Sequence, residues 1–503
     1  MRNEHRKHYK KEHKEIKGDR LSLNQYVMMG VGGIIGAGFF LASGFAIRLS
    51  GPAVIINYTL SAFIMWRVFY ALADMSVANP AVGSFCIYTR DYLGKWAGFM
   101  SGWIYWIAGV LVMSSEVTAS GIFTRYWLPQ TPLWVFTLIY SILVVYLNFK
   151  DTKEFGTVEA DFSFIKVGAL VAMSFIGIGV ILTHFRMPAV GLENFYAQGG
   201  FFAGGLRGFF GAMLMSLIPY GGIEVAAMAA ASVYKPEENV PRGVNAIFTM
   251  LVGLYLVSMT VLLLLTPWNR VPTSASPFVV MFTYVRVPYI DSILNFVILS
   301  AALTTMNAAM FGVTRVLFSL GQGEWAPTIF TRENSRGVPV YALGASSMGL
   351  TLAVVLSYLL PKDVYEYITS ATGFMQFFNW GIILLAYMAF LKKRQLAPEE
   401  TQDQNLTPKT RLVPQTSAIY PESAIARGFS DESYKPARKV HAGSTFISPQ
   451  TSSKIALALL VLTLASPLLI PKERISVLIA LGIIFAVGAG FKIGEKFDIF
   501  QRW

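Results

Sequence analysis

The stretch Gly30–Phe40, GVGGIIGAGFF, lies inside an apolar run from about residue 25 to 46 that is long enough to cross a membrane. Each glycine in a helix interior costs about 1 kcal/mol relative to alanine, so five of them argue against a plain spanning helix. One interpretation is a helix interrupted within the membrane, whose free N–H groups would attract a carboxylate. The other is close packing through small residues, which the spacing from Gly32 to Gly36 also allows.

A second stretch, Leu217–Glu224 or LIPYGGIE, also lies inside an apolar run. Pro219 removes a helix N–H, two glycines follow, and Glu224 places a carboxyl group within the membrane. Interrupted segments at corresponding positions of two halves point to the binding site of a transporter. The two stretches fall in the first and the sixth predicted spans, which favours this interpretation and predicts a five-plus-five inverted repeat.

The composition predicts an all-α polytopic membrane protein. Of 503 residues 54% are hydrophobic and 14% are charged, whereas a soluble protein carries about 25% charge. Apolar runs of spanning length predict twelve transmembrane helices, at about residues 24–47, 52–72, 97–121, 132–149, 161–183, 206–230, 244–266, 289–319, 339–360, 364–391, 455–471 and 475–492.

The basic residues predict the orientation. With both termini in the cytoplasm, 29 of the 41 Lys and Arg residues fall in cytoplasmic segments and 8 in outer loops. The net charge of +12 then reflects topology and contact with anionic membrane lipid, and is no evidence for nucleic acid. The single cysteine, Cys86, excludes an internal disulfide and a cysteine-based metal cluster, and we expect no metal, cofactor or enzymatic activity.

Four segments follow from these patterns. A basic cytoplasmic tail (1–23) precedes a transport core (24–391), whose repeats would be 24–183 and 206–391. Residues 392–454 are rich in Pro, Ser, Thr, Gln and charge, which predicts a disordered cytoplasmic linker. The last two spans, within 455–503, are expected to serve packing or dimer contact, and we expect a monomer or a homodimer.

Two charged residues lie inside predicted spans. Glu116 in the third span could carry a proton, contact a substrate ammonium group or link helices, with hydroxyl groups of Ser114, Ser115 and Thr118 as hydrogen-bond partners. Lys166 in the fifth span could exchange a proton if it is buried. Alternatively, its side chain extends to the cytoplasmic surface.

Further polar residues are ambiguous. Residues 73–99 are predicted to form a cytoplasmic loop, whose charged residues, Asp74 among them, either latch an inner gate or are ordinary loop charges. In the eighth span, Thr305 is one of several residues with hydroxyl or amide side chains, which either line a path through the protein or pack helices together.

Several motifs together carry a family resemblance. They are GVGGIIGAGFFLASG, SVANPAVGSFCIYTRDYLG, VMSSEVTAS, FSFIKV, PYGGIEVAAMAAA with KPEENVPRGV, and GEWAPTIFTRENSRGVPV, in this order between Leu21 and Leu391. The chain resembles the amino acid permeases of the amino acid–polyamine–organocation superfamily, in particular the bacterial and fungal amino acid transporter branch. The resemblance implies a leucine-transporter-type fold with helices 1 and 6 broken, and secondary transport of amino acids across the plasma membrane.

The resemblance also implies roles for residues. Backbone N–H groups of the first motif would bind the substrate α-carboxylate, and carbonyl groups at the sixth-span break would bind the α-ammonium group. The implied substrate-binding residues are Ile34, Ile35, Gly36, Ala37, Gly38, Ile218, Pro219, Tyr220 and Gly221, with Glu116 as a further contact.

The lysine of the FSFIKV motif, here Lys166, occupies the place of a sodium ion in proton-coupled relatives. The resemblance therefore implies proton coupling, with Glu116 and Glu224 as further proton-coupling candidates. We expect a proton-coupled amino acid importer in which spans 1, 2, 6 and 7 rock as a bundle. The alternatives are an amino acid exchanger on the same fold and a non-transporting amino acid sensor. Three features depart from the common pattern: Asp74 in place of Glu, Pro219 ahead of the break, and the long linker.

Overall fold

The computed structural model describes residues 21–78, 85–150, 155–184, 191–230, 233–284, 289–396 and 448–496. In these residues the regular structure is helical, with two isolated bridges and no β-strand. Nine of the described helices are long and apolar enough to cross a membrane, or ten if a bent pair counts as one span. The chain is thus a multi-pass membrane protein, while the twelve spans and the inverted repeat stay predictions.

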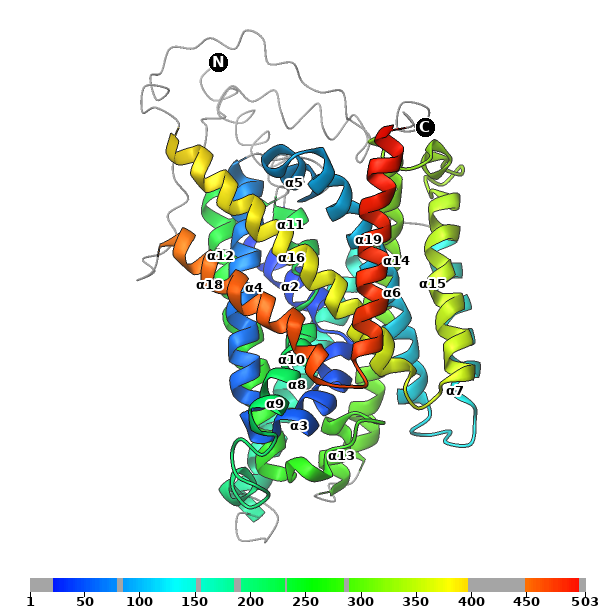
Figure 1. The fold of residues 1–503 in the computed structure, drawn as a ribbon. Helices are drawn as coiled ribbons and strands as arrows, with labels where there is room; N and C mark the ends of the chain where they lie inside the picture. Colours follow the sequence, from blue (N-terminus) through cyan, green and yellow to red (C-terminus); the bar gives the residue numbers. More distant parts are fainter. Residues whose placement is uncertain are drawn as a thin grey trace, which may run out of the picture.

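The first half of the described chain runs from one end of the bundle to the other several times (Figure 1). Its longer helices are α2 (Leu23–Ile34), α3 (Ser43–Ser50), α4 (Val54–Ala78), α5 (Phe85–Leu93), α6 (Lys95–Thr124), α7 (Leu133–Lys150) and α8 (Phe155–His184). Short turns of other helix types are the π-helix η1 (Gly38–Ala42) and the 3-10 helices η2 (Gly51–Ala53) and η3 (Leu192–Phe195).

The second half contains a further set of helices around the same core. They are α9 (Gly205–Gly211), α10 (Met213–Leu217), α11 (Ile223–Ala229), α12 (Pro236–Leu265), α13 (Pro277–Tyr284), α14 (Ile290–Gln322), α15 (Val340–Leu359), α16 (Val364–Leu396), α18 (Pro449–Ala465) and α19 (Arg474–Lys496). Short 3-10 turns are η4 (Ile218–Tyr220), η6 (Trp268–Arg270), η7 (Thr328–Thr331) and η9 (Ser466–Leu469).

Local chemistry explains where several helices begin and end. At the start of α2, Ser22 and Gln25 form a capping box, in which each side chain accepts a hydrogen bond from the other residue's backbone N–H. Helix α3 ends at Gly51, whose φ of 65° suits glycine. Helix α12 begins with Pro236 in its first turn, followed by two glutamates that favour a helix N-terminus.

Both predicted interruptions are present. Helix α2 ends at Ile34, Ile35 is extended with ψ of 102°, and η1 then leads into α3. In the sixth predicted span the axis bends by 40° between α9 and the following helix. Further on, η4 gives way to Gly221 and to Gly222 at φ 96°, before α11 begins.

The predicted loop at residues 73–99 is largely helical instead. Helix α4 continues to Ala78, α5 occupies part of the remainder, and α6 begins at Lys95; residues 79–84 lie outside the described part. Asp74 is therefore a residue of α4 and is only 6% exposed. It is held there by partners on α16, Tyr387 and Arg394, that the local sequence did not indicate.

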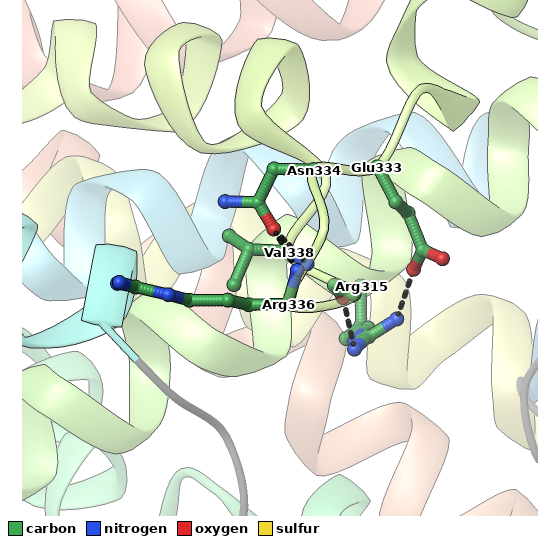
Figure 2. Close-up of polar contacts among 6 residues, drawn as sticks. Arg315, Glu333, Asn334, Arg336 and Val338 are labelled. Atoms are coloured by element: carbon green, nitrogen blue, oxygen red, sulfur yellow. Dashed lines mark hydrogen bonds and ion pairs between the residues drawn. The ribbon is translucent and has the colours of Figure 1, made fainter.

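The loop between α14 and α15 is held by a polar cluster that Figure 2 shows. Arg315 of α14 donates to the Glu333 carboxylate and to the Gly337 carbonyl, each at 3.0 Å. The Asn334 carboxamide oxygen accepts from the backbone N–H groups of Arg336 and Val338 at 2.9 and 3.0 Å. This explains how the motif of Gly323–Val340 reverses the chain between the two helices.

The N-terminal tail and most of the predicted linker lie outside the described residues, at 1–20 and 397–447. The two ends that flank the linker are described. Gln450 of α18 donates to Gln395 of α16 at 3.0 Å, so these ends meet in space.

Candidate functional site

The two interrupted segments contact each other inside the bundle. A Cβ atom placed on Gly222 would lie 3.1 Å from the carbonyl oxygen of Gly33, and one on Gly38 would lie 3.2 Å from a side-chain carbon of Ile218. Two interrupted segments about 185 residues apart in the chain therefore lie against each other, an arrangement that broken helices at a transporter's binding site also have.

At the first break a backbone N–H group binds a carboxylate. The N–H of Ala37 donates to both carboxylate oxygens of Glu116 on α6, at 3.2 and 3.1 Å. Glu116 is 5% exposed. The first N–H groups of a helical segment have no partner within it and carry partial positive charge, so they favour an anion there.

The glycines of this stretch serve both purposes that the sequence suggested. A Cβ atom on Gly36 would lie 2.8 Å from a carboxylate oxygen of Glu116 and 3.0 Å from a methyl carbon of Thr305, so any larger residue at the bend requires one of these side chains to move. A Cβ atom on Gly32 would lie 1.6 Å from the hydroxyl oxygen of Ser163, where α2 packs tightly on α8. Gly33, in contrast, has no heavy atom within 4 Å of that position.

Lys166 of α8 contacts the end of α2. Its ammonium group donates to the carbonyl of Gly32 at 3.0 Å and to the hydroxyl of Thr305 at 3.2 Å. Thr305 in turn donates to the carbonyl of Ile35 at 3.3 Å. Lys166 is 1% exposed, so the interpretation that its side chain extends to the surface is wrong. A cation is favoured at this position, because the last carbonyl groups of a helix carry partial negative charge.

The hydroxyl groups next to Glu116 in the sequence have partners other than its carboxylate. Ser115 and Thr118 donate to carbonyl groups of their own helix, and Ser114 donates to the carbonyl groups of Val110 and Gly349. The expected hydrogen bonds from these residues to Glu116 are therefore replaced by backbone contacts, which are within reach of a helical Ser or Thr.

At the second break two of the expected carbonyl groups already have donors. The carbonyl of Ile218 accepts from the N–H of Gly221 at 2.9 Å, and that of Pro219 accepts from the hydroxyl of Tyr255 at 3.0 Å. A carbonyl oxygen has two lone pairs, so each can accept a further hydrogen bond. The Tyr220 ring packs against Tyr255 with ring centroids 5.2 Å apart.

Glu224 lies at a separate place, just after the second break. It is 1% exposed, and one carboxylate oxygen accepts a hydrogen bond of 2.5 Å from the indole of Trp380 on α16. A Cβ atom on Gly221 would lie 2.9 Å from the side-chain amide of Gln376, which also belongs to α16. The structure thus brings Glu116 and Lys166 to the first break, and Glu224 to the second.

Apolar and aromatic side chains border the site on the side of α16. Ile218 packs toward Gly373, where an added Cβ atom would lie 3.0 Å from its side chain. The ring of Phe45 on α3 stacks on Tyr365 of α16, with centroids 6.1 Å apart. Ile218 of the second break and Phe45 of α3 thus both pack on α16.

Several contacting residues were missed by the sequence analysis. Thr305 was noted only as one polar residue of its span, although it bonds both Lys166 and the first break. Tyr255 and Trp380 carried no signal, because an aromatic residue in an apolar span looks like a packing residue until its polar atom has a partner.

Comparison with known proteins agrees with this geometry. The family model described as amino acid permease matches residues 25–419. The chain is 34% identical over 394 residues to the amino acid permease YtnA of Bacillus subtilis, covering 78% of this chain and 84% of that protein. It is also 34% identical over 368 residues to the aromatic amino acid transport protein AroP of Escherichia coli K12, covering 73% of this chain and 80% of AroP.

Proposed function

The chain belongs to the amino acid permease family, and on that premise we propose that it imports an α-amino acid across the plasma membrane together with a proton. The observation that carries the proposal is the hydrogen bonding of a carboxylate by the Ala37 N–H at the first break. A site that binds one carboxylate through main-chain groups suits the α-carboxylate of any amino acid.

In this proposal the substrate α-carboxylate binds the N–H groups of Gly36, Ala37 and Gly38. Ile34 and Ile35, expected as further donors, lie at the same break but do not supply an N–H, because Ile34 belongs to α2 and the N–H of Ile35 donates to the carbonyl of Val31 at 3.1 Å. The substrate's α-ammonium group binds carbonyl oxygens of Ile218, Pro219, Tyr220 and Gly221. The contact between Gly222 and the Gly33 carbonyl supports this arrangement, because it means that the two breaks are adjacent. Glu116 then either leaves Ala37 or loses its charge by protonation when the substrate carboxylate arrives.

The proton step is assigned to Lys166 and Glu116. A protonated Lys166 has three donors, two of which bond Gly32 and Thr305 and so hold the end of α2 against α8 and α14. In this proposal the protonated, substrate-loaded protein opens toward the cytoplasm, and Lys166 then gives its proton to cytoplasmic water. Loss of that proton removes the charge from both hydrogen bonds and loosens α2, which would favour release of the substrate on the same side. Glu224, bonded to Trp380, is a further candidate for carrying the proton.

We further propose twelve spans, of which the first ten form a five-plus-five inverted repeat, with α2 to α3 as span one and α9 to α11 as span six. The positive charge of the predicted cytoplasmic segments supports placing both termini inside. The bundle of spans 1, 2, 6 and 7 would move relative to the others during transport.

An aromatic side chain is the first candidate for the transported amino acid. AroP, which is similar over most of its length, is an aromatic amino acid transport protein. The apolar side chain of Ile218 at the second break supports the same choice.

Counterflow into proteoliposomes preloaded with phenylalanine tests the substrate class. Uptake of labelled phenylalanine should be inhibited by excess tyrosine or tryptophan, and not by lysine, glutamate or glycine. Equal inhibition by all of these, or inhibition by the charged amino acids alone, would contradict the aromatic assignment.

A further inference from the structure

Helix α4 carries two charged residues, Arg67 and Asp74, in an otherwise uncharged sequence. Arg67 is 2% exposed and Asp74 is 6% exposed. Charged residues inside a membrane helix are costly, and they persist where specific partners or a function require them. The partners of Arg67 and Asp74 therefore identify the helices to which α4 is attached.

Arg67 contacts the first turn of α18. One guanidinium nitrogen donates to the hydroxyl of Ser453 at 3.0 Å and to the carbonyl of Pro449 at 3.3 Å. The guanidinium carbon also lies 5.2 Å from the ring centre of Trp66 and 5.9 Å from that of Tyr387. Aromatic faces stabilise a buried cation, and among the described residues Arg67 has no ion pair with a carboxylate.

Asp74 makes the matching attachment to α16, two turns further along α4. Its carboxylate accepts a hydrogen bond of 2.9 Å from the hydroxyl of Tyr387 and lies 3.7 Å from a guanidinium nitrogen of Arg394. Tyr387 therefore contacts both charges of α4, with its ring facing Arg67 and its hydroxyl bonded to Asp74. Figure 1 shows α16 and α18 running beside each other across α4.

The N-terminal half of α4 packs next to the proposed substrate site. Tyr58 packs edge-on against Tyr220 of the second break, with ring centroids 6.1 Å apart. Arg67 is nine residues further along, at about 13 Å along the helix axis. Arg67 cannot touch the substrate, but it is rigidly connected to a residue that packs on the break.

We propose that Arg67 fastens α18 to α4, so that the eleventh span moves together with the bundle that carries the two breaks. The inference rests on the proposed transport cycle, in which α4 moves relative to the rest of the protein. If α18 stayed behind, each cycle would leave a buried guanidinium group without its acceptors, which is strongly unfavourable. Asp74 holds Tyr387 and Arg394 in the same way, so the C-terminal part of α16 is expected to follow α4 as well. Arg67 is thus a positioning residue for transport, and α18 is more than a packing helix outside the moving part.

A covalent replacement of the contact tests this. The variants Arg67→Cys, Ser453→Cys and the double variant are made in a Cys86→Ala background, since Cys86 is the single native cysteine. The double variant is then bridged by a thiol-specific cross-linker about as long as the arginine side chain. Initial rates of phenylalanine counterflow give kcat and KM for each protein.

Arg67→Cys should lower kcat at least about tenfold while KM stays within about twofold, because the residue lies away from the substrate. Bridging the double variant should restore kcat to within about threefold of the Cys86→Ala parent. If bridging instead abolishes the remaining transport, the contact must open in each cycle and the proposal is wrong. Wild-type kcat for Arg67→Cys without a bridge would also overturn it.

A second measurement needs no substitution of Arg67. Spin labels are placed on exposed residues of α4 and α18, Ile56 and Val461, and in a control pair on Ile56 and Met348 of α15. Addition of substrate should change the distance of the control pair and leave that between α4 and α18 unchanged. A change in the α4–α18 distance as large as in the control pair would refute the shared movement. Failure of the proposed function would appear differently, as a Cys86→Ala parent that transports no amino acid in the counterflow assay.

Discussion

Replacing Gly36 by alanine tests whether the bend at the first break binds through its backbone. The added Cβ atom would lie 2.8 Å from a carboxylate oxygen of Glu116, and 3.0 and 3.2 Å from two atoms of Thr305. One of these side chains must move, and moving Glu116 breaks its hydrogen bonds to the N–H of Ala37. In the proposed site the substrate carboxylate takes the place of Glu116 at this N–H, so the loss of affinity comes from the Cβ atom, which occupies the position where a carboxylate oxygen approaches. A hydrogen bond to a charged group contributes about 1.5–3 kcal/mol, so loss of one such bond should lower substrate affinity about 10- to 150-fold.

The assay is equilibrium binding of labelled phenylalanine to the purified protein, measured by scintillation proximity. Gly33→Ala is the matched control, because it makes the same change three residues earlier, where a Cβ atom meets no heavy atom within 4 Å. This control should keep wild-type affinity, and alanine in place of a helical glycine could raise stability by up to about 1 kcal/mol. Equal affinities for the two variants would refute the role given to the bend.

Two further predictions concern the buried charges. Lys166→Met should abolish uptake driven by a pH gradient and leave counterflow measurable, because it removes the cation that bonds Gly32 and Thr305. Lys454→Met, at an exposed position, serves as the control. Uptake driven by a pH gradient in Lys166→Met would contradict the assignment of the proton step to this lysine. At the turn before α19, burial and the neighbouring Glu366 raise the pKa of Glu473 from 4.5 to about 8, while Lys472 pairs with Asp363 and Glu366 at 2.6 Å. The folded protein then binds this proton more tightly than the unfolded chain, so stability should fall as pH rises from about 4.5 to about 8, by at most about 5 kcal/mol, and level off above. Thermal unfolding between pH 5 and 9 should show this slope in the wild type and lose it in Glu473→Gln; the same slope in both proteins would exclude Glu473 as its source.

Sequence reasoning located the two breaks because glycine and proline disturb a helix wherever they occur. The positions of Gly36 and Gly222 at the bends follow from that local rule. Charge in an apolar run likewise singled out Glu116, Lys166 and Glu224, and all three side chains are buried. These are features that short stretches of sequence determine.

The partners of those residues could not be found in the same way. Lys166 bonds a backbone carbonyl 134 residues away, and Glu224 bonds an indole 156 residues away. Asp74 was placed in a loop because a charge near the end of an apolar run usually marks its boundary. Its partner Tyr387 lies 313 residues further along, so only the folded chain shows that α4 continues past it.

The measurement that tests the central claim most directly is uptake of labelled phenylalanine into liposomes that contain the purified protein. An imposed pH gradient, acid outside, is compared with an imposed sodium gradient and with neither, at a clamped membrane potential. The account predicts accumulation with the pH gradient alone, up to about tenfold per pH unit for one proton per substrate. Uptake only into liposomes preloaded with amino acids would contradict it and indicate an exchanger.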